Sequence, residues 1–205
     1  MIVRKMQEHL KDIQEYWEVI SKSDLDQDFK DHWIDENGDP LNEKLFKEIA
    51  EYIINFNSSS KTILEVGCGT GRILKNIQNK NKNINLFGID ISQNQINLCK
   101  ENVLDCVLHA GDLESFIKEY PLSNFDLIFL HSVTQYFPSQ EYFERFLDQA
   151  YSQLNIGGSL LLIDVPNSWY IDLVDEKKIT TIRLIKLLIK KLIPKFIFKN
   201  YKKNK

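Results

Sequence analysis

Three glycines at alternate positions, Gly67, Gly69 and Gly71, follow the short apolar run 62–66. Because glycine has no Cβ, a turn built from these residues lets the backbone approach a ligand closely. A tight turn between a strand and a helix is the alternative interpretation. A dinucleotide site of the Gly-x-Gly-x-x-Gly type would need a further glycine at position 72, which is occupied by Arg72. The spacing therefore disfavours a nicotinamide or flavin cofactor.

Acidic residues and a histidine stand at the ends of the other apolar runs. Asp90 ends the run 84–90, and its carboxylate can accept two hydrogen bonds at once, as from a diol. Asp112 follows the next run, and His131 ends the one after that. His131 is the best candidate for a general base, because the unperturbed pKa of histidine lies near neutrality. The alternatives are helix capping at Asp90 and Asp112 and a packed strand-end histidine at His131.

The elements that hold these residues follow from the hydrophobic pattern. Strands are predicted at 62–66, 84–90, 106–109, 125–130 and 159–165, and helices at 71–79, 92–103, 113–120 and 139–154. Residues 127–130 are apolar without alternation, as expected for a parallel strand covered by helices on both sides. The pattern predicts an α/β fold, a doubly wound parallel sheet with helices on both faces and a ligand site at the carboxyl ends of its strands.

Taken together and in this order, the motifs closely resemble those of the class I S-adenosylmethionine-dependent methyltransferases, whose first motif is an acidic residue followed by Gly-x-Gly-x-Gly. The resemblance covers residues 62–167 and rests on the series of motifs, not on the glycines alone. It implies a Rossmann-like fold and S-adenosylmethionine as the cofactor. The cofactor-binding residues that it implies are Glu65, Gly67, Cys68, Gly69, Gly71, Asp90, Ile91, Asp112, Leu113 and His131.

The resemblance assigns a role to each acidic residue of the donor site. It implies that Asp90 binds the 2′- and 3′-hydroxyls of the cofactor and that Asp112 binds the adenine amino group. The backbone of Leu113 is then expected near the adenine ring. Glu65 is expected to organise the glycine loop and the methionine amino group, and its negative charge suits a cationic donor.

The ends of the last two predicted strands are expected to face the methyl acceptor. The candidate catalytic residues are His131 and Tyr136. His131 is the candidate base that a hydroxyl acceptor would require, and Tyr136 is expected to orient the acceptor. Asp164, Pro166 and Asn167 fall beside this pocket and resemble the same strand end in methyltransferases that act on sugars or other metabolites. Little covalent machinery is needed, because the sulfonium already activates the methyl group.

Residues 1–60 are predicted to form an N-terminal helical lid, because apolar residues such as Leu10 and Ile13 recur there at helical spacing. In small-molecule members of the family that the chain resembles, helices before the first strand often cover the acceptor. The aromatic residues expected to do so are Tyr16, Trp17, Phe29 and Trp33, with packing against the sheet edge as the alternative. Residues 61–167 then form the cofactor-binding core.

Charge is divided unevenly along the 205 residues. Residues 1–177 carry 16 Lys/Arg against 29 Asp/Glu, whereas residues 178–205 carry 10 Lys/Arg and no acid. The acidic part argues against binding of duplex nucleic acid, whose affinity comes mainly from contacts of Lys/Arg with phosphates. No apolar run has the length of a signal peptide or a membrane span, so a cytoplasmic protein is expected. The three cysteines and four histidines are too scattered to predict a disulfide framework or a metal site.

The segment 168–205 departs from the family pattern, which continues through a further helix and an antiparallel strand pair. Residues 179–194 place Arg183, Lys186 and Lys190 on one stripe beside a broad apolar face, which predicts a basic helix in place of the closing strands. Three explanations compete. The first, which we favour, is that the segment is the truncated end of a longer methyltransferase. The second is a helix that makes peripheral contact with an anionic membrane. The third is a helix that covers the sheet or a dimer interface.

The first functional hypothesis is a methyltransferase that uses S-adenosylmethionine and acts on an oxygen or nitrogen of a small molecule, with a sugar or other metabolite as the expected acceptor. The second is a non-catalytic protein of the same fold that keeps the cofactor pocket and serves as a partner or regulatory subunit. An oxidoreductase with a nucleotide cofactor is a distant third.

Overall fold

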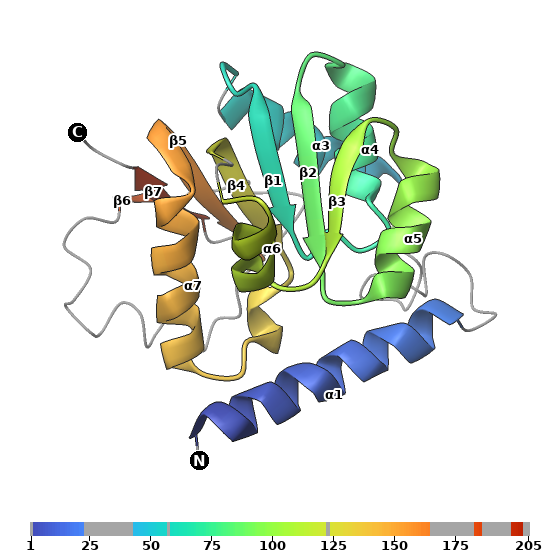
Figure 1. The fold of residues 1–205 in the computed structure, drawn as a ribbon. Helices are drawn as coiled ribbons and strands as arrows, with labels where there is room; N and C mark the ends of the chain where they lie inside the picture. The colour runs from blue at the N-terminus through green and yellow to red at the C-terminus, as the bar shows by residue number, and fades with distance from the viewer. Residues whose placement is uncertain are drawn as a thin grey trace.

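The computed structural model describes residues 2–22, 43–56, 58–121, 124–164, 183–185 and 198–202. Their strands form one sheet in the order β3-β2-β1-β4-β5-β7-β6 (Figure 1). The parallel strands are β1 (Thr62–Val66), β2 (Asn85–Asp90), β3 (Cys106–Ala110), β4 (Phe125–His131) and β5 (Leu154–Ile163). Strand β7 (Phe198–Lys202) pairs antiparallel with β5, and β6 (Arg183–Ile185) pairs antiparallel with β7.

Helices cover both faces of the sheet (Figure 1). One face carries α3 (Glu43–Phe56), α4 (Arg72–Lys80) and α5 (Gln93–Asn102), and the other carries α6 (Leu113–Glu119) and α7 (Gln140–Ser152). The side chains of β4 divide between the two cores. Leu127 and Phe129 pack with α3, α4 and α5, whereas Ile128 and Leu130 pack with α6 and α7. Because burying such a side chain is worth about 1.5–3 kcal/mol, an apolar strand is most stable between two helix layers. The predicted doubly wound α/β fold is confirmed.

The direction in which the chain crosses the sheet reverses at β1. From β1 the chain runs outward through β2 to β3, and it then returns to the other side of β1, where Val66 pairs with Leu130 of β4. In open α/β sheets, ligands bind outside the carboxyl ends of the strands at such a switch point. The reversal brings the loop after β1 beside the end of β4, where the glycines and His131 lie.

The N-terminal helix α1 (Ile2–Lys22) lies across the carboxyl ends of the parallel strands (Figure 1). Its residues Leu10, Ile13 and Trp17 line the cavity at this edge of the sheet. Trp17 therefore stands where the predicted lid requires it, while Tyr16 is largely exposed. The two other aromatic residues of the predicted lid, Phe29 and Trp33, lie outside the described residues.

Helix α1 is attached to the N-terminus of α5 through Glu18. The Glu18 carboxylate accepts a hydrogen bond from Ser92 Oγ at 3.1 Å and from the backbone N–H of Asn94 at 3.4 Å. The Nδ2 group of Asn94 also donates to the backbone oxygen of Glu18 at 3.3 Å. The negative charge of Glu18 is favourable at this position, because the N-terminus of a helix carries a partial positive charge. These contacts hold α1 over the cavity.

The prediction that a basic helix replaces the closing strands is wrong where the structure describes that segment. Residues 183–185 form β6, and β7 pairs with β5 through Leu160 and Tyr201. The outer edge of β5 carries backbone N–H and C=O groups that need partners, and pairing with β7 supplies them. Of the predicted basic stripe the structure describes only Arg183, which lies in β6 and not in a helix. Pro166, Asn167 and residues 186–197 lie outside the described part of the chain.

None of the helices among the described residues combines the length and the apolar character that a membrane-spanning helix needs.

Candidate active site

The loop between β1 and α4 is folded over the end of β2. The backbone N–H groups of Gly67 and Cys68 both donate to the backbone oxygen of Ile89, at 2.8 and 3.0 Å. The N–H of Gly71 then donates to the oxygen of Cys68 at 2.9 Å, which closes the turn into α4. The three glycines have φ values of +75°, +52° and +80°, a region that side chains with a Cβ rarely adopt. The turn therefore requires glycine on conformational grounds alone.

Packing separates Gly69 from the two other glycines. A Cβ on Gly67 would lie 2.3 Å from Cγ2 of Val133, and a Cβ on Gly71 would lie 2.4 Å from Sγ of Cys99. A Cβ on Gly69 would meet no atom within 4 Å, although Gly69 lines the cavity. The structure thus explains Gly67 and Gly71 by close packing within the protein. Gly69 leaves open space in which a ligand can approach the loop.

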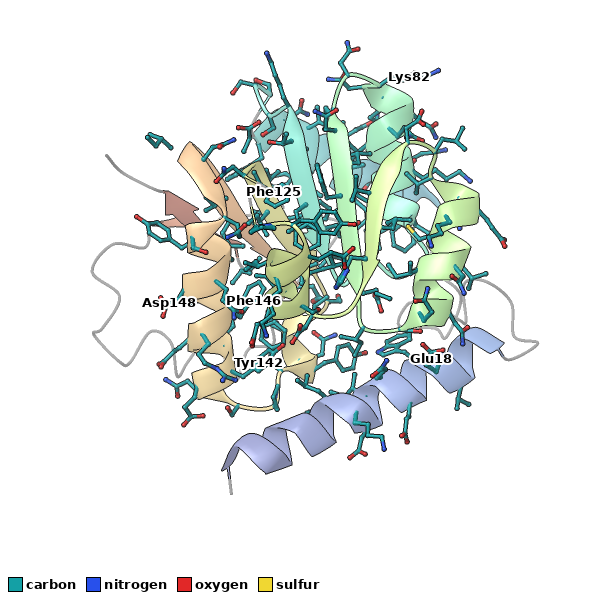
Figure 2. All side chains as sticks on the ribbon, viewed as in Figure 1. Glu18, Lys82, Phe125, Tyr142, Phe146 and Asp148 are labelled. Carbon is teal, nitrogen blue, oxygen red and sulfur yellow. The ribbon has the colours of Figure 1, made fainter. Side chains whose placement is uncertain are left out.

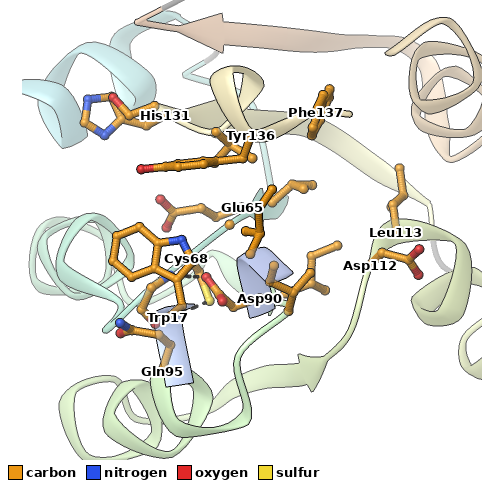
Figure 3. Close-up of a pocket in the computed structure, with 18 of the residues that line it drawn as sticks. Trp17, Glu65, Cys68, Asp90, Gln95, Asp112, Leu113, His131, Tyr136 and Phe137 are labelled. Carbon is orange, nitrogen blue, oxygen red and sulfur yellow. Dashed lines mark hydrogen bonds between the residues drawn. The ribbon is translucent and has the colours of Figure 1, made fainter. Parts of the chain in front are cut away.

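Asp90 connects this loop to α5. Its Oδ2 accepts from the N–H of Gly69 at 2.9 Å, and its Oδ1 accepts from the N–H of Ser92 at 2.9 Å (Figure 3). Burial raises the pKa of Asp90 to about 6, and these two hydrogen bonds oppose the rise. Ser92 itself caps α5 by accepting from the N–H of Gln95. The cap interpretation therefore applies to Ser92, and the partly buried Asp90 is a lining residue of the cavity.

Glu65 stands at the cavity wall with one oxygen unsatisfied. The side chain is buried in β1, and its Oε2 has no hydrogen-bond partner among the described residues. Burial raises the pKa of Glu65 well above its usual value, and the nearby Cys99 and Asp90 raise it further. A buried carboxyl oxygen without a hydrogen bond lowers the stability of the protein unless a ligand donates a hydrogen bond to it. This arrangement suits a ligand that brings a cationic hydrogen-bond donor.

Asp112 and Leu113 lie at the start of α6, on the far side of Asp90. Asp112 is the N-cap of α6, because its Oδ1 accepts from the N–H of Ser115 at 2.9 Å. The capping alternative is thus confirmed for Asp112, a residue that also lines the cavity, beside the buried Leu113. The contact of Asp112 with an adenine ring remains a prediction. The loop before it is tied to β2 by the N–H of Gly111, which donates to the oxygen of Asp90 at 2.8 Å.

One cavity of about 310 Å³ joins these groups, a volume within the range of small-molecule sites. Nine of the ten predicted cofactor-binding residues line it, namely Glu65, Gly67, Cys68, Gly69, Asp90, Ile91, Asp112, Leu113 and His131. The exception is Gly71, which packs against Cys99 and Val103 instead. The topology therefore brings together residues that are spread over more than sixty positions of the sequence.

Gln95 and Ser132 also line the cavity, although neither was predicted from the sequence to be a site residue. Gln95 is buried in the first turn of α5, and its Oε1 has no hydrogen-bond partner among the described residues. Nothing in its sequence surroundings marks Gln95, because a glutamine in a helix is usually a surface residue. Ser132 had a positional signal, since it directly follows the end of β4.

The two predicted catalytic residues lie at the cavity, in different environments. His131 is buried at the end of β4, and its burial lowers its pKa to about 3, so the ring is neutral at pH 7. This disfavours the predicted role of general base, which requires a pKa near the working pH. Tyr136 lies in the 3-10 turn Thr134–Tyr136. Its ring packs edge to face against the ring of Trp17, with 5.9 Å between the ring centroids (Figure 3). Tyr136 and Trp17 thus connect the residues after β4 to α1.

Solved structures with similar folds include several methyltransferases. The plantazolicin methyltransferase BpumL, in complex with a pentazolic desmethylPZN analog and SAH, is 20% identical with a TM-score of 0.54, over 83% of this chain and 66% of that one. A TehB-like SAM-dependent methyltransferase from Corynebacterium glutamicum is 17% identical with a TM-score of 0.59, over 82% of this chain and 91% of that one. At these low sequence identities, the similarity to these structures shows a shared fold and nothing more.

A family model described as a methyltransferase domain matches residues 57–195, which is more than half of the chain. The chain belongs to the class I S-adenosylmethionine-dependent methyltransferases. A tRNA N(3)-methylcytidine methyltransferase of Schizosaccharomyces pombe is 29% identical over 58% of this chain and 41% of its own length. A malonyl-[acyl-carrier protein] O-methyltransferase of Priestia megaterium is 28% identical over 76% of this chain and 56% of its own length. The chain spans about half the length of these curated relatives.

S-adenosylmethionine is the cofactor of this family, and the cavity of this methyltransferase fits it. The charged residues that line the cavity are Glu65, Arg72, Asp90, Asp112 and Asp164. The cofactor brings a sulfonium, an ammonium and a single carboxylate, so a mostly acidic wall with one cationic side chain complements it. A bound cofactor would donate a hydrogen bond to the unsatisfied oxygen of Glu65 and would fill the open space beside Gly69.

A Gly69→Ala variant should lose affinity for S-adenosylhomocysteine, the demethylated product, by about tenfold or more, because the new Cβ occupies the space beside the loop. Gly157→Ala is the matched control, since Gly157 also has a positive φ and open space around it. Both variants should be destabilised by about 1–2 kcal/mol through backbone strain. Calorimetric titration measures the affinities, and equal affinities in the two variants would contradict this account of the loop.

Proposed function

We propose that this methyltransferase transfers the methyl group of S-adenosylmethionine to an oxygen or nitrogen of a small-molecule acceptor. The observation that carries the proposal is the placement of α1 over the carboxyl ends of the strands. Leu10, Ile13 and Trp17 close a cavity whose other walls are the loops after β1, β2 and β3 and the ends of β4 and β5. Coverage of the cavity by α1 favours a compact acceptor that reaches the cofactor beneath this helix.

In this proposal the donor half of the cavity holds the cofactor through three strand ends. Asp90 accepts hydrogen bonds from the ribose hydroxyls, and Asp112 and the backbone of Leu113 contact the adenine. The unsatisfied Oε2 of Glu65 receives the ammonium of the methionine part. Gly69 provides the surface on which the cofactor lies. The sheet order β3-β2-β1 supports this assignment, because it places the adenine, ribose and methionine contacts in a row.

The cofactor, when bound, supplies a methyl carbon on a positively charged sulfur. The acceptor lone pair would form a bond to that carbon while the carbon–sulfur bond breaks with its electron pair left on sulfur, and the acceptor proton would pass to bulk water on release of the product. The protein residues align the acceptor and exclude water. Trp17 and Tyr136, in edge-to-face contact, form an apolar wall for this purpose. Positioning of this kind can lower a barrier by roughly 7–11 kcal/mol.

A small acceptor is favoured over a nucleic acid by charge. Residues 1–177 carry 16 Lys/Arg against 29 Asp/Glu, a balance that repels a polyanion. The cavity itself is also lined by more acidic than basic residues. The tRNA methyltransferase among the relatives is therefore a poor guide to the acceptor of this chain. The proposal includes a cytoplasmic reaction, as expected from the sequence.

A panel of small alcohols, amines and amino sugars, incubated with the chain and S-adenosylmethionine, tests the proposal. The expected result is formation of S-adenosylhomocysteine that depends on the acceptor, with the product gaining the mass of one methylene group. Binding of S-adenosylhomocysteine without turnover on any member of the panel would favour the non-catalytic alternative. Absence of both binding and turnover would contradict the proposal.

A Glu18→Ala variant should loosen the lid helix. Loss of the hydrogen bonds to Ser92 and Asn94 should reduce the free energy of local opening of α1 by about 1–2 kcal/mol, which speeds amide hydrogen exchange in α1 roughly 5- to 30-fold. Glu15→Ala is the matched control, because Glu15 lies on the same helix and makes only an exposed ion pair with Lys11. Equal exchange rates in the two variants would show that Glu18 does not hold the lid.

A further inference from the structure

The ends of β4 and β5 carry a polar pair that the cofactor contacts do not use. Ser132 follows β4 and Asp164 follows β5, and Ser132 Oγ donates a hydrogen bond to Oδ2 of Asp164. The two strand ends are adjacent, because the N–H of Ser132 also donates to the backbone oxygen of Ile163 at 3.1 Å. Both residues line the cavity. The pair is therefore part of the wall and not of the surface outside it.

Ser132 and Asp164 adopt a backbone conformation that is unusual for residues with a side chain. Their φ values are +54° and +58°. Residues of this kind persist only where the surrounding structure holds them, and they gather at active sites and ligand clamps. Here the side-chain hydrogen bond and the adjacent strand ends hold both residues. The geometry fixes the Asp164 carboxyl group at one end of the cavity.

The sheet order separates Asp164 from the carboxyl groups of the donor half. Asp112, Asp90 and Glu65 belong to the consecutive strand ends β3, β2 and β1, whereas β5 is two strands beyond β1. Neighbouring strands are about 4.8 Å apart, so the end of β5 lies roughly 10 Å from the end of β1. In the proposed function the cofactor contacts Asp112, Asp90 and Glu65. Asp164 is left without a cofactor contact and lies at the acceptor end.

Two other buried atoms indicate independently that the cavity is built around a polar ligand. Oε2 of Glu65 and Oε1 of Gln95 both belong to side chains at the cavity wall that are more than nine-tenths buried. Neither atom has a hydrogen-bond partner among the described residues. Buried polar atoms are nearly always satisfied in proteins, so a ligand with several hydrogen-bond donors is expected here.

We propose that Asp164, positioned by Ser132, binds the methyl acceptor and selects an alcohol or an amine over a carboxylate. The inference rests on the proposed function and names its substrate class. The O–H or N–H of the acceptor donates to the Asp164 carboxylate, which then orients the acceptor lone pair. A carboxylate acceptor has no such proton and brings a negative charge to a cavity with four acidic residues and one arginine among its described lining. The same charges attract the ammonium form of an amine, which must lose a proton to bulk water before its lone pair can attack the methyl carbon.

Fragment binding to the full chain saturated with S-adenosylhomocysteine tests this selection. Benzylamine, benzyl alcohol and benzoate share one ring and similar size, so they serve as matched probes in an NMR titration. The amine and the alcohol should bind the wild-type complex at least about tenfold more tightly than benzoate, a difference of 1.4 kcal/mol. Asp164→Asn should reduce this difference to about threefold or less, because asparagine keeps the shape and tolerates positive φ without the charge.

Asp148→Asn is the matched control, since Asp148 is an exposed acid on α7, and it should keep the wild-type selection. Ser132→Ala should give an intermediate result, because it removes the hydrogen bond that positions Asp164 and leaves its charge. Wild-type binding of benzoate equal to the other probes, or of no probe at all, would overturn the inference. Loss of S-adenosylhomocysteine binding in Asp164→Asn would also overturn it, because Asp164 would then belong to the donor site. Failure of the wild-type chain to bind S-adenosylhomocysteine would instead overturn the proposed function.

Discussion

An Asp90→Ala variant should bind S-adenosylhomocysteine about 100-fold more weakly than the wild type or worse. The change removes the proposed acceptor of two ribose hydrogen bonds and the observed partner of the Gly69 and Ser92 N–H groups. Hydrogen bonds to a charged group are worth about 1.5–3 kcal/mol each, so two of them account for at least this factor. Isothermal titration calorimetry measures the affinity, and Asp148→Ala, a change on the exposed surface of α7, is the control (Figure 2).

The pH dependence of this affinity provides a second measurement of the same contact. In the free protein Asp90 is protonated below its raised pKa of about 6, and a protonated carboxyl cannot accept both hydroxyl hydrogen bonds. Affinity should therefore rise by about tenfold per pH unit up to pH 6 and then level off. Asp90→Asn should lose the part of this dependence that is centred near 6 and keep any part due to Glu65. An affinity that is constant from pH 5 to 7 in the wild type would contradict the assignment.

The second large effect is expected on stability. A Gly71→Ala variant should lose about 2–4 kcal/mol of unfolding free energy, because overpacking and positive φ act together. The new Cβ would lie 2.4 Å from Sγ of Cys99 and 2.8 Å from Cγ2 of Val103, at a φ of +80°. Both neighbours belong to the packed interface between α4 and α5 and have little room to move.

Gly157→Ala separates the two contributions to the Gly71 effect. Gly157 has nearly the same φ, +81°, and its Cβ would meet nothing within 4 Å, so only the strain of about 1–2 kcal/mol remains. Denaturant unfolding of both variants measures the difference. Equal losses would show that contact with Cys99 and Val103 is unimportant and that glycine is required at Gly71 only for its backbone conformation.

The parallel sheet could be predicted from the sequence because its strands are buried on both faces. Residues 127–130 are continuously apolar, and the structure places them alternately in the two cores. The positions of Glu65, Asp90 and His131 at strand ends were also predictable, because parallel strands bring their carboxyl ends to one edge of the sheet. These positions are determined by the order of elements and need no knowledge of packing.

The environments of individual side chains were not predictable in the same way. The suitability of His131 as a base depends on its solvation, and the sequence does not reveal that the ring is buried. The unsatisfied oxygen of Gln95 and the bond between Ser132 and Asp164 depend on contacts between separate elements. Strand β7 was missed because its pairing depends on the open edge of β5, more than thirty residues earlier in the chain.

The central claim is that the cavity at the carboxyl ends of the strands holds S-adenosylmethionine. Its most direct test is chemical unfolding of the wild-type chain with and without S-adenosylhomocysteine, the product that cannot react further. At a free ligand concentration about 100 times the dissociation constant, the unfolding free energy should rise by about 2.7 kcal/mol. In Asp90→Ala, which should bind about 100-fold more weakly, the increase at that concentration should be only about 0.4 kcal/mol or less. A well-folded wild-type chain whose stability does not change with S-adenosylhomocysteine or S-adenosylmethionine would contradict the account.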